Sequence, residues 1–222
     1  MQDIIVSWSG GKDSAFALHT FLQSKDFRVI GLLSTISEST ERLPVHEVSR
    51  ELLHAQASSL KLPLYEVSMP NNASNLQYET ILGTQFKKLS QEGVNSIAYA
   101  DIYLEDIRTY REQLLQKYKM TGVYPLWGKG TSKIAKQFIQ EGYKAVVTTV
   151  DRDVLPQSLV GAMFNDSFLH DLPVEVDPCG ERGEFHTFVY DGPIFETPIS
   201  IRKGRVFSSH TKRFAHVDLV LG

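Results

Sequence analysis

The stretch that decides the fold lies at the start of the chain and reads Ile4-Ile5-Val6-Ser7-Trp8-Ser9-Gly10-Gly11-Lys12-Asp13-Ser14. An apolar run that ends at a pair of glycines predicts a buried strand followed by a tight turn. Residues 15–18 are apolar at helical spacing, so we expect a helix that begins near Ser14 and is capped by Asp13 or Ser14. A strand, a glycine turn and a helix present backbone N–H groups to a phosphate, and the helix dipole favours the same anion.

The residues of this turn suit a phosphate. The two glycines carry no Cβ, so an oxygen atom can come close to the main chain. Ser9 and Ser14 offer hydroxyl donors, and Lys12 offers a mobile positive charge. Asp13 offers a carboxylate, either for Mg²⁺ or for fixing the loop. A Walker A loop is excluded, because it needs four residues between its first glycine and the Gly-Lys pair. The alternative, a glycine turn with solvated polar neighbours, is disfavoured by the flanking strand and helix.

After an N-terminal strand, this turn resembles the pyrophosphate-binding loop of the N-type ATP pyrophosphatases. Those enzymes cleave ATP between the α and β phosphates and transfer AMP to a substrate oxygen. The resemblance implies a Mg²⁺ ligand at Asp13 and an ATP-binding loop that consists of Ser9, Gly10, Gly11, Lys12, Asp13 and Ser14.

The composition narrows the classes of function. The net charge is −3, which argues against a broad basic face for nucleic acid. Cys179 is the single cysteine, so the chain has no internal disulfide and no cysteine pair for zinc or redox chemistry. No apolar run approaches 18 residues, and the chain starts with a strand rather than a signal peptide. We therefore expect a cytoplasmic protein with no membrane partner.

The order of apolar and polar segments predicts an α/β fold. Further strands are expected over residues 28–36, 64–68, 96–101, 123–128 and 144–150, and helices over residues 44–60, 76–91 and 133–141 and from residue 104. Strand and helix alternate six times, which predicts a parallel sheet with helices on both faces. We assign residues 1–155 to this nucleotide-binding domain.

The pattern changes after residue 155, where we expect a smaller C-terminal substrate-binding domain over residues 156–222. Short helical turns are expected at 159–161 and 164–169. The rest is rich in turns and prone to form strands, over residues 184–190, 199–201 and 205–207, the last two joined by a turn at Lys203-Gly204.

Polar residues follow several of the predicted strands. Ser34 and Thr35 end the second strand, where adenine or ribose could bind, since open α/β sheets bind ligands beyond the carboxyl ends of their strands. His46 lies at the start of the next helix, where a surface position is the alternative. Asp101 ends the fourth strand. Arg108 and Arg111 lie one helical turn apart and could hold a triphosphate or a carboxylate; pairing with Glu105 and Glu112 on a solvated face is equally compatible with the spacing.

A second glycine-rich loop covers residues 177–187. Glu181 and Glu184 are three residues apart and flanked by glycines, so the loop can aim both carboxylates at one point. Such a pair suits binding of ammonium or ammonia, or work as a general base. The alternative is an acidic surface turn. Cys179 is either a nucleophile or, as we favour, a buried and inert thiol.

Together, these motifs resemble the diphthine–ammonia ligase family of the adenine nucleotide alpha-hydrolase superfamily, with a Rossmann-like, HUP-type fold. The matching pieces cover nearly the whole chain: residues 9–14, the His46 segment, Asp101 with Arg108, residues 125–128, residues 180–188 and residues 191–195. The resemblance implies an enzyme that adenylates a carboxylate with MgATP, releases pyrophosphate, and lets ammonia displace AMP to form an amide.

The resemblance also implies roles for individual residues. Catalysis is expected at Lys12, Asp13, Arg108, Glu181 and Glu184. Binding of ATP is expected at the first loop together with Ser34, Thr35, His46 and Asp101. Binding of the acceptor is expected at Trp127, Gly180, Glu181, Gly183, Glu184, His186 and Thr187.

The sequence departs from the family pattern at Arg182, where a small residue is usual, and at Arg111, which is shifted by one position. Residues 176–181 look more like bacterial relatives, so the expected acceptor is a carboxylate of a small molecule or a protein, either diphthine or another. Two other functions stay open: a tRNA-modifying ATP pyrophosphatase of the thiolase or lysidine type, and a non-enzymatic ATP-sensing module. A homodimer is also compatible with the sequence.

Overall fold

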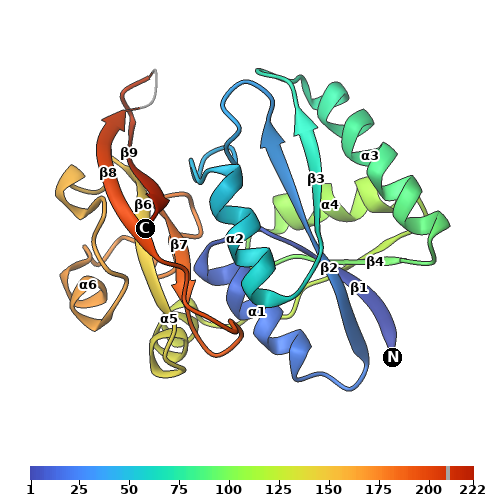
Figure 1. The fold of residues 1–222 in the computed structure, drawn as a ribbon, viewed down its shortest axis with the longest axis horizontal. Coiled ribbons are helices and arrows are strands. Elements are labelled where there is room, and N and C mark those ends of the chain that lie inside the picture. Colours follow the sequence, from blue (N-terminus) through green and yellow to red (C-terminus); the bar gives the residue numbers. More distant parts are fainter. Residues whose placement is uncertain (209–210) are drawn as a thin grey trace.

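A computed structural model describes residues 1–208 and 211–222 and contains two sheets (Figure 1). The first sheet has five strands in the order β3-β2-β1-β4-β5, and every pairing in it is parallel. The second sheet has four strands in the order β7-β6-β9-β8, and its pairings are antiparallel. The expected Rossmann-like fold with a β-rich C-terminal part is confirmed.

The first sheet is covered by helices on both faces. Its strands are β1 (Gln2–Ser7), β2 (Phe27–Ser37), β3 (Leu64–Met69), β4 (Ser96–Ala98) and β5 (Thr121–Val123). The helices are α1 (Lys12–Leu22), α2 (Arg50–Leu60), α3 (Asn75–Gln91) and α4 (Glu105–Gln116). Side chains alternate across β1, so Ile4 and Val6 pack in the core with α1 and α2, whereas Ile5 packs in the core with α3 and α4. Helices α1 and α2 lie between the two sheets (Figure 1).

Two helices begin elsewhere than predicted. Helix α1 begins at Lys12 after Gly11, without a side-chain cap, because the Ser14 hydroxyl donates to the Gly11 carbonyl and Asp13 pairs with Lys12. Helix α2 begins at Arg50, not near Pro44, and the Ser49 hydroxyl accepts a hydrogen bond from an N–H of its first turn. Residues 44–46 instead form a turn and Ser49 forms a β-bridge with Arg42, and Val45 and Glu47 are in the left-handed region (φ 69° and 55°). His46 therefore lies on a loop.

Strands β4 and β5 also differ from the prediction. Strand β4 ends at Ala98, so Asp101 lies in the loop beyond it. Strand β5 ends at Val123, and residues 125–128 form turns closed by a hydrogen bond from the Gly128 N–H to the Ile102 carbonyl (2.8 Å). Pro125 has no N–H to donate to a sheet, which explains why the strand does not continue through it.

The largest difference concerns the sixth predicted strand. Strand β6 (Lys144–Asp151), which follows α5 (Thr131–Gln140), belongs to the second sheet and pairs with β7 (Phe185–Asp191) and β9 (Phe214–Leu221). The parallel sheet therefore has five strands rather than six. Strand β8 (Ile201–Ser208) runs through the predicted turn at Lys203-Gly204 as one strand with an irregular register. Between β6 and β7 the chain forms a 3₁₀ turn (Gln157–Leu159) and α6 (Asp166–Asp171), close to the expected helical turns.

The second sheet packs directly against the glycine loop of the first. The Val189 N–H on β7 donates to the Gly10 carbonyl (2.9 Å). One continuous hydrophobic core includes Trp8 and Phe16 from the first part and Phe185 and Phe188 from β7. The predicted division of the chain near residue 155 stays a prediction. Within the described residues, no helix is both long and apolar enough to cross a membrane.

Candidate active site

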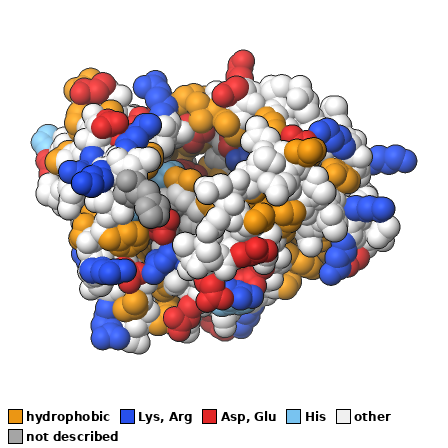
Figure 2. All heavy atoms as spheres, turned by 90° about the horizontal axis from the view of Figure 1, so that it is seen from above, with side chains coloured by type: hydrophobic (Ala, Val, Ile, Leu, Met, Phe, Trp, Pro, Cys, Tyr) orange, Lys and Arg blue, Asp and Glu red, His pale blue; other side chains and the backbone are white. Residues whose placement is uncertain are grey.

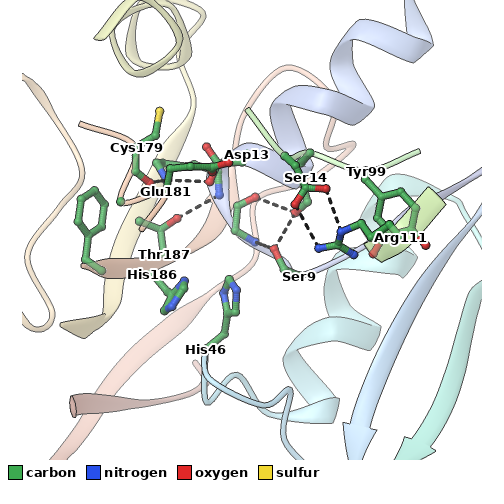
Figure 3. A pocket seen from close by; sticks show the side chains of 17 residues that line it. Ser9, Asp13, Ser14, His46, Tyr99, Arg111, Cys179, Glu181, His186 and Thr187 are labelled. Carbon is green, nitrogen blue, oxygen red and sulfur yellow. Dashed lines mark hydrogen bonds and ion pairs between the residues drawn. The ribbon is translucent and has the colours of Figure 1, made fainter. Parts of the chain in front are cut away.

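A cavity of about 240 Å³ lies between the glycine loop and the second glycine-rich loop (Figure 3). From above, the molecule is hollowed near its centre, between its two halves (Figure 2). The cavity collects side chains from the ends of β1 and β4, from α1, α4 and β7, and from the loop before α2. Its lining consists of Ser7, Ser9, Gly11, Lys12, Asp13, Ser14, His46, Tyr99, Ala100, Asp101, Arg111, Cys179, Gly180, Glu181, Phe185, His186 and Thr187.

The main chain of the glycine loop is held by hydroxyl groups. The Gly11 N–H donates to Ser9 Oγ (3.3 Å), and the Lys12 N–H donates to Thr187 Oγ1 on β7 (3.0 Å). A Cβ atom at Gly11 would lie 3.0 Å from the Thr187 carbonyl oxygen, so glycine allows this close approach. Neutral hydroxyls are weaker acceptors than a charged phosphate oxygen. The loop and the N-terminus of α1 thus form a cradle that fits an anion.

Lys12, which is buried, and Asp13, which is partly exposed, form an ion pair in the cavity. The Lys12 side chain is 3% exposed, and its Nζ lies 2.9 Å from Asp13 Oδ2 and also donates to the Cys179 carbonyl. Burial alone lowers the pKa of Lys12, but Asp13, Cys179 and Glu181 more than offset this and raise the pKa above its usual value. Burial raises the pKa of Asp13, and Lys12 opposes the rise. Lys12 is therefore held as a cation.

Asp13 provides the observation that tests whether Mg²⁺ fits. Its Oδ1 is buried and has no hydrogen-bond partner among the described residues. Mg²⁺ is usually held by one or two carboxylates together with substrate phosphates and waters. In residues 1–208 and 211–222, no cluster of three or more His, Cys, Asp or Glu side chains could hold a metal by itself. The residues therefore fit a Mg²⁺ that is shared with a phosphate, with Asp13 as the protein ligand.

Glu181, from the second glycine-rich loop, lies beside Asp13 in the cavity (Figure 3). Burial raises the pKa of its carboxyl to about 7, helped by the negative charges of Asp13 and Asp101. A hydrogen bond from the Ile102 N–H to Glu181 Oε1 (2.7 Å) opposes the rise. A carboxyl group with such a pKa can take up and release a proton near neutral pH.

Glu184 does not join Glu181 at the cavity. Its side chain is buried, and its two carboxylate oxygens accept hydrogen bonds from the Asp177 N–H (3.1 Å) and the Arg182 N–H (3.0 Å). The predicted convergence of the two carboxylates is therefore wrong. Backbone donors within a tight loop are the nearest partners for a buried carboxylate, so Glu184 fixes the shape of the loop.

The two arginines of α4 point to different surroundings. Arg108 pairs with Glu112 (2.7 Å), and its guanidinium lies 4.6 Å from the ring centre of Trp127 and 4.8 Å from that of Tyr124. Neither Arg108 nor Trp127 lines the cavity. Arg111 lines it instead.

Arg111 lies over the Tyr99 ring (4.3 Å to the centroid) with its Nε 2.9 Å from Asp101 Oδ2. The angle at that Nε is poor for a hydrogen bond, so the better-aligned contact is the one from Arg111 Nη2 to Asp101 Oδ1 (3.2 Å). Arg111 is thus a second cation at the cavity, balanced by one carboxylate.

Two histidines stand side by side at the edge of the cavity (Figure 3). The ring centres of His46 and His186 are 4.3 Å apart. Burial, with the positive charge of Lys12, lowers the pKa of His46 to about 4 and holds the pKa of His186 well below its usual value. His46 Nδ1 and His186 Nε2 are buried and have no hydrogen-bond partner in the described part of the chain. The pair is neutral and has ring nitrogens free for a ligand.

Other predicted residues lie away from the cavity. Ser34 is buried, and its hydroxyl donates to the Trp8 carbonyl (2.6 Å). The predicted residues outside the lining are Gly10, Ser34, Thr35, Arg108, Trp127, Gly183 and Glu184. Cys179 does line the cavity, but burial raises the pKa of its thiol, which fits the inert group that we favoured.

Two further residues were not predicted from the sequence: Tyr99, which lines the cavity, and Gln56, which is buried on α2. A polar residue between the buried Leu53 and Ala57 of α2 was the signal for Gln56.

Comparison with known proteins finds a family for both parts of the chain. The sequence-family model of the diphthamide synthase N-terminal domain matches residues 2–121, and the sequence-family model of the diphthamide synthase C-terminal domain matches residues 130–220. A diphthine–ammonia ligase of Schizosaccharomyces pombe is 25% identical over 213 residues, which cover 86% of this chain but 34% of that protein. The chain thus spans about a third of the length of that relative.

Vertebrate relatives match over more of their length. The diphthine–ammonia ligase of Danio rerio is 23% identical over 214 residues, which cover 87% of this chain and 84% of that protein. The human diphthine–ammonia ligase is 21% identical over 231 residues, which cover 94% and 86%. Because the two domain models together account for most of the sequence, the chain belongs to the diphthamide synthase family.

Proposed function

We propose that this protein is an ATP-dependent amide ligase. The substrate carboxylate attacks the α phosphate of ATP and releases pyrophosphate, and ammonia then forms the C–N bond as the bond to AMP breaks. The observation that carries the proposal is the placement of Glu181, which titrates near neutral pH, in the same cavity as the glycine loop with Lys12 and Asp13. The relatives named diphthine–ammonia ligase support the ligase class.

The glycine loop would bind the β and γ phosphates. Its N–H groups now donate to the hydroxyls of Ser9 and Thr187, which phosphate oxygens can replace as stronger acceptors. Lys12 is held as a buried cation, so it can offset the charge that develops on pyrophosphate as it leaves. Mg²⁺, when bound, would add a second positive charge at these phosphates, and Asp13 would hold it through Oδ1.

Glu181 would accept a proton during amide formation. Ammonium must lose a proton before its nitrogen can attack the acyl carbon, and the new amide must lose another. A carboxylate with a pKa near 7 accepts a proton more readily than an ordinary glutamate does. The N–H of Ile102 holds one oxygen of Glu181, so the other can turn to the substrate.

The acceptor would enter between the two loops. Arg111 supplies a cation in the cavity, which can hold the acceptor carboxylate while the acceptor approaches the nucleotide. Its partner Asp101 keeps the guanidinium in place. Diphthine, which the relatives' name specifies, is one candidate acceptor. The N-terminal part would thus bind ATP and the C-terminal part would complete the acceptor pocket.

The test is to incubate the purified protein with ATP, Mg²⁺, ammonium chloride and a panel of carboxylates that includes diphthine. We expect AMP and pyrophosphate in equal amounts, with a rate that depends on both an acceptor and ammonium. Release of ADP instead of AMP, or AMP formation that ammonium does not affect, would contradict amide ligation. AMP formation that requires tRNA would favour a tRNA-modifying enzyme.

A further inference from the structure

Gln56 joins three segments that meet behind the glycine loop. It lies on α2 with no exposed surface. Its Nε2 donates to the Gly10 carbonyl (3.0 Å) and to the Val189 carbonyl on β7 (2.6 Å), and its Oε1 accepts from Trp8 Nε1 (2.9 Å). One buried amide therefore links the end of β1, the glycine loop and the second sheet.

The orientation of this amide follows from its partners. The Trp8 indole N–H can only donate, so it must face the oxygen of Gln56. The two carbonyl oxygens can only accept, so they must face the NH₂ group. Both donors and the acceptor of the side chain are used, and no apolar residue of similar size could replace any of these bonds.

The amide of Gln56 reinforces one of the two contacts between the glycine loop and β7. Gly10 is in the left-handed region (φ 72°), and its carbonyl accepts from both Gln56 and the Val189 N–H. On the other side of the loop, the Lys12 N–H donates to Thr187, two residues before Val189. The loop is thus fixed to β7 at two points, at Thr187 through the Lys12 N–H and at Val189 through Gly10. At the second point the Gln56 amide also donates to the carbonyls of Gly10 and Val189.

We propose that Gln56 is a positioning residue that holds the ATP-binding loop in register with β7, whose residues His186 and Thr187 line the cavity. The proposal rests on the proposed function, since it assigns ATP to the loop and the acceptor to the second half. Through Gly10 and Val189, Gln56 sets where the loop amides stand relative to His186 and Thr187. Without it, the protein folds but binds ATP poorly and aligns it poorly with the acceptor.

Ser59 provides a matched control on the same helix, one turn later. Its hydroxyl donates to the Thr197 carbonyl (2.6 Å) and accepts from the Thr197 N–H (3.1 Å), and the residue is 8% exposed. It therefore ties α2 to the C-terminal half as Gln56 does, but it has no contact with the glycine loop. A purely structural tether would give the same result at both positions.

The experiment compares Gln56→Met with Ser59→Ala. Thermal unfolding reports stability, equilibrium binding measures ATP affinity, and AMP formation with ammonium and the best acceptor gives KM and kcat. We expect Gln56→Met to weaken ATP binding and raise the KM for ATP by about tenfold or more, whereas Ser59→Ala stays within about twofold of the wild type. Both variants should unfold at lower temperature.

Equal ATP affinity and KM in the two variants would overturn the positioning role. If Gln56→Met does not fold, Trp8→Phe removes the donor that orients the amide, together with part of a buried ring, and leaves Gln56 in place. We expect a smaller rise in KM of the same kind, and a KM equal to that of the wild type would overturn the proposal. A wild-type protein that binds no ATP would refute the proposed function, and with it this inference. Wild-type binding with unaffected variants refutes the inference alone.

Discussion

The two glycine-rich loops that close the cavity are built from similar residues but leave different groups for a ligand. In the first, over residues 9–14, hydroxyls take up the backbone N–H groups, and Lys12 and Asp13 keep their charges at the cavity. In the second, over residues 177–184, carboxylates accept the hydrogen bonds of the backbone N–H groups. Asp177 Oδ1 accepts from the Cys179 N–H (2.7 Å), and Glu184 accepts two further N–H groups.

The difference shows how to interpret acidic residues in a tight loop. A buried carboxylate that can reach backbone donors is stabilised there and is lost as a ligand, because each such bond satisfies a buried polar group. Glu181 keeps a carboxylate oxygen for the cavity because, among the described residues, one backbone N–H alone, that of Ile102, donates to its side chain. The first loop thus offers charge for binding, and the second offers one group whose proton can be exchanged.

The largest effect is expected when the first loop loses its cation. Lys12→Met keeps the length of the side chain but removes the charge that offsets the leaving pyrophosphate, and we expect a fall in AMP formation of roughly 100- to 1,000-fold. Lys129→Met, at an exposed position outside the cavity, is the matched control and should retain the wild-type rate. A Lys12 variant with normal kcat/KM for ATP would contradict the role of the first loop.

The second loop should respond very differently at its two glutamates. Glu181→Gln removes the group with a pKa of about 7, and we expect a loss of roughly 100-fold in amide formation. In the wild type the rate, expressed per free ammonia, should rise with pH and level off above about pH 7, because only the ionised carboxylate accepts a proton. Glu181→Gln should abolish this rise.

Glu184→Gln is the matched variant for this comparison. It replaces one acceptor of a backbone N–H by a donor, and we expect a loss of about 1–3 kcal/mol in the free energy of unfolding. The pH dependence of amide formation should remain. If instead Glu184→Gln loses the rise with pH and Glu181→Gln keeps it, the assignment of roles within the loop is wrong.

A smaller effect should separate the two arginines of α4. Arg111→Ala removes a cation at the cavity, and we expect KM for the acceptor to rise by about tenfold, as for loss of a charge-assisted contact. Arg108→Ala breaks an ion pair and two ring contacts away from the cavity, so it should lower the unfolding temperature and leave this KM unchanged. Equal increases in KM would show that the two side chains share one site.

The accuracy of the sequence predictions follows how local each interaction is. The strand, turn and helix over residues 2–22 could be predicted, because the apolar run, the glycine pair and the helix lie next to each other. Strand β6 was assigned to the wrong sheet, since a strand that is buried on both faces has the same sequence pattern in either sheet. Of its two partners in the second sheet, β7 was predicted as a strand and β9 was not.

The candidate site shows the same limit at the level of side chains. Lys12, Asp13, His46, Glu181 and His186 were expected at the site and line one cavity. Glu184 and Arg108 were expected there as well. Glu184 instead binds backbone donors that only the folded loop provides, and Arg108 takes the alternative that the spacing had left open, pairing with Glu112 beside the Trp127 ring. Spacing along a helix or loop places a side chain near a site and does not decide which neighbour it takes.

The smallest expected effect concerns two histidines, His46 in the loop before α2 and His216 on β9. Burial lowers the pKa of both His46 and His216 to about 4, against about 6.5 in an unfolded chain. The unfolded state therefore binds protons that the folded state does not, and the free energy of unfolding should decrease as the pH falls from about 6.5 towards 4. Urea unfolding at several pH values measures this slope.

Single variants then show how much each residue contributes to the slope of the free energy of unfolding against pH. His46→Gln and His216→Gln should each flatten it, whereas the exposed His170→Gln should not, because its surroundings change little on unfolding. Lys12→Met should also flatten it, since part of the lowering at His46 comes from the Lys12 charge. A slope that Lys12→Met leaves unchanged would show that burial alone keeps His46 neutral, and that the first loop does not reach electrostatically across the cavity to the histidine pair.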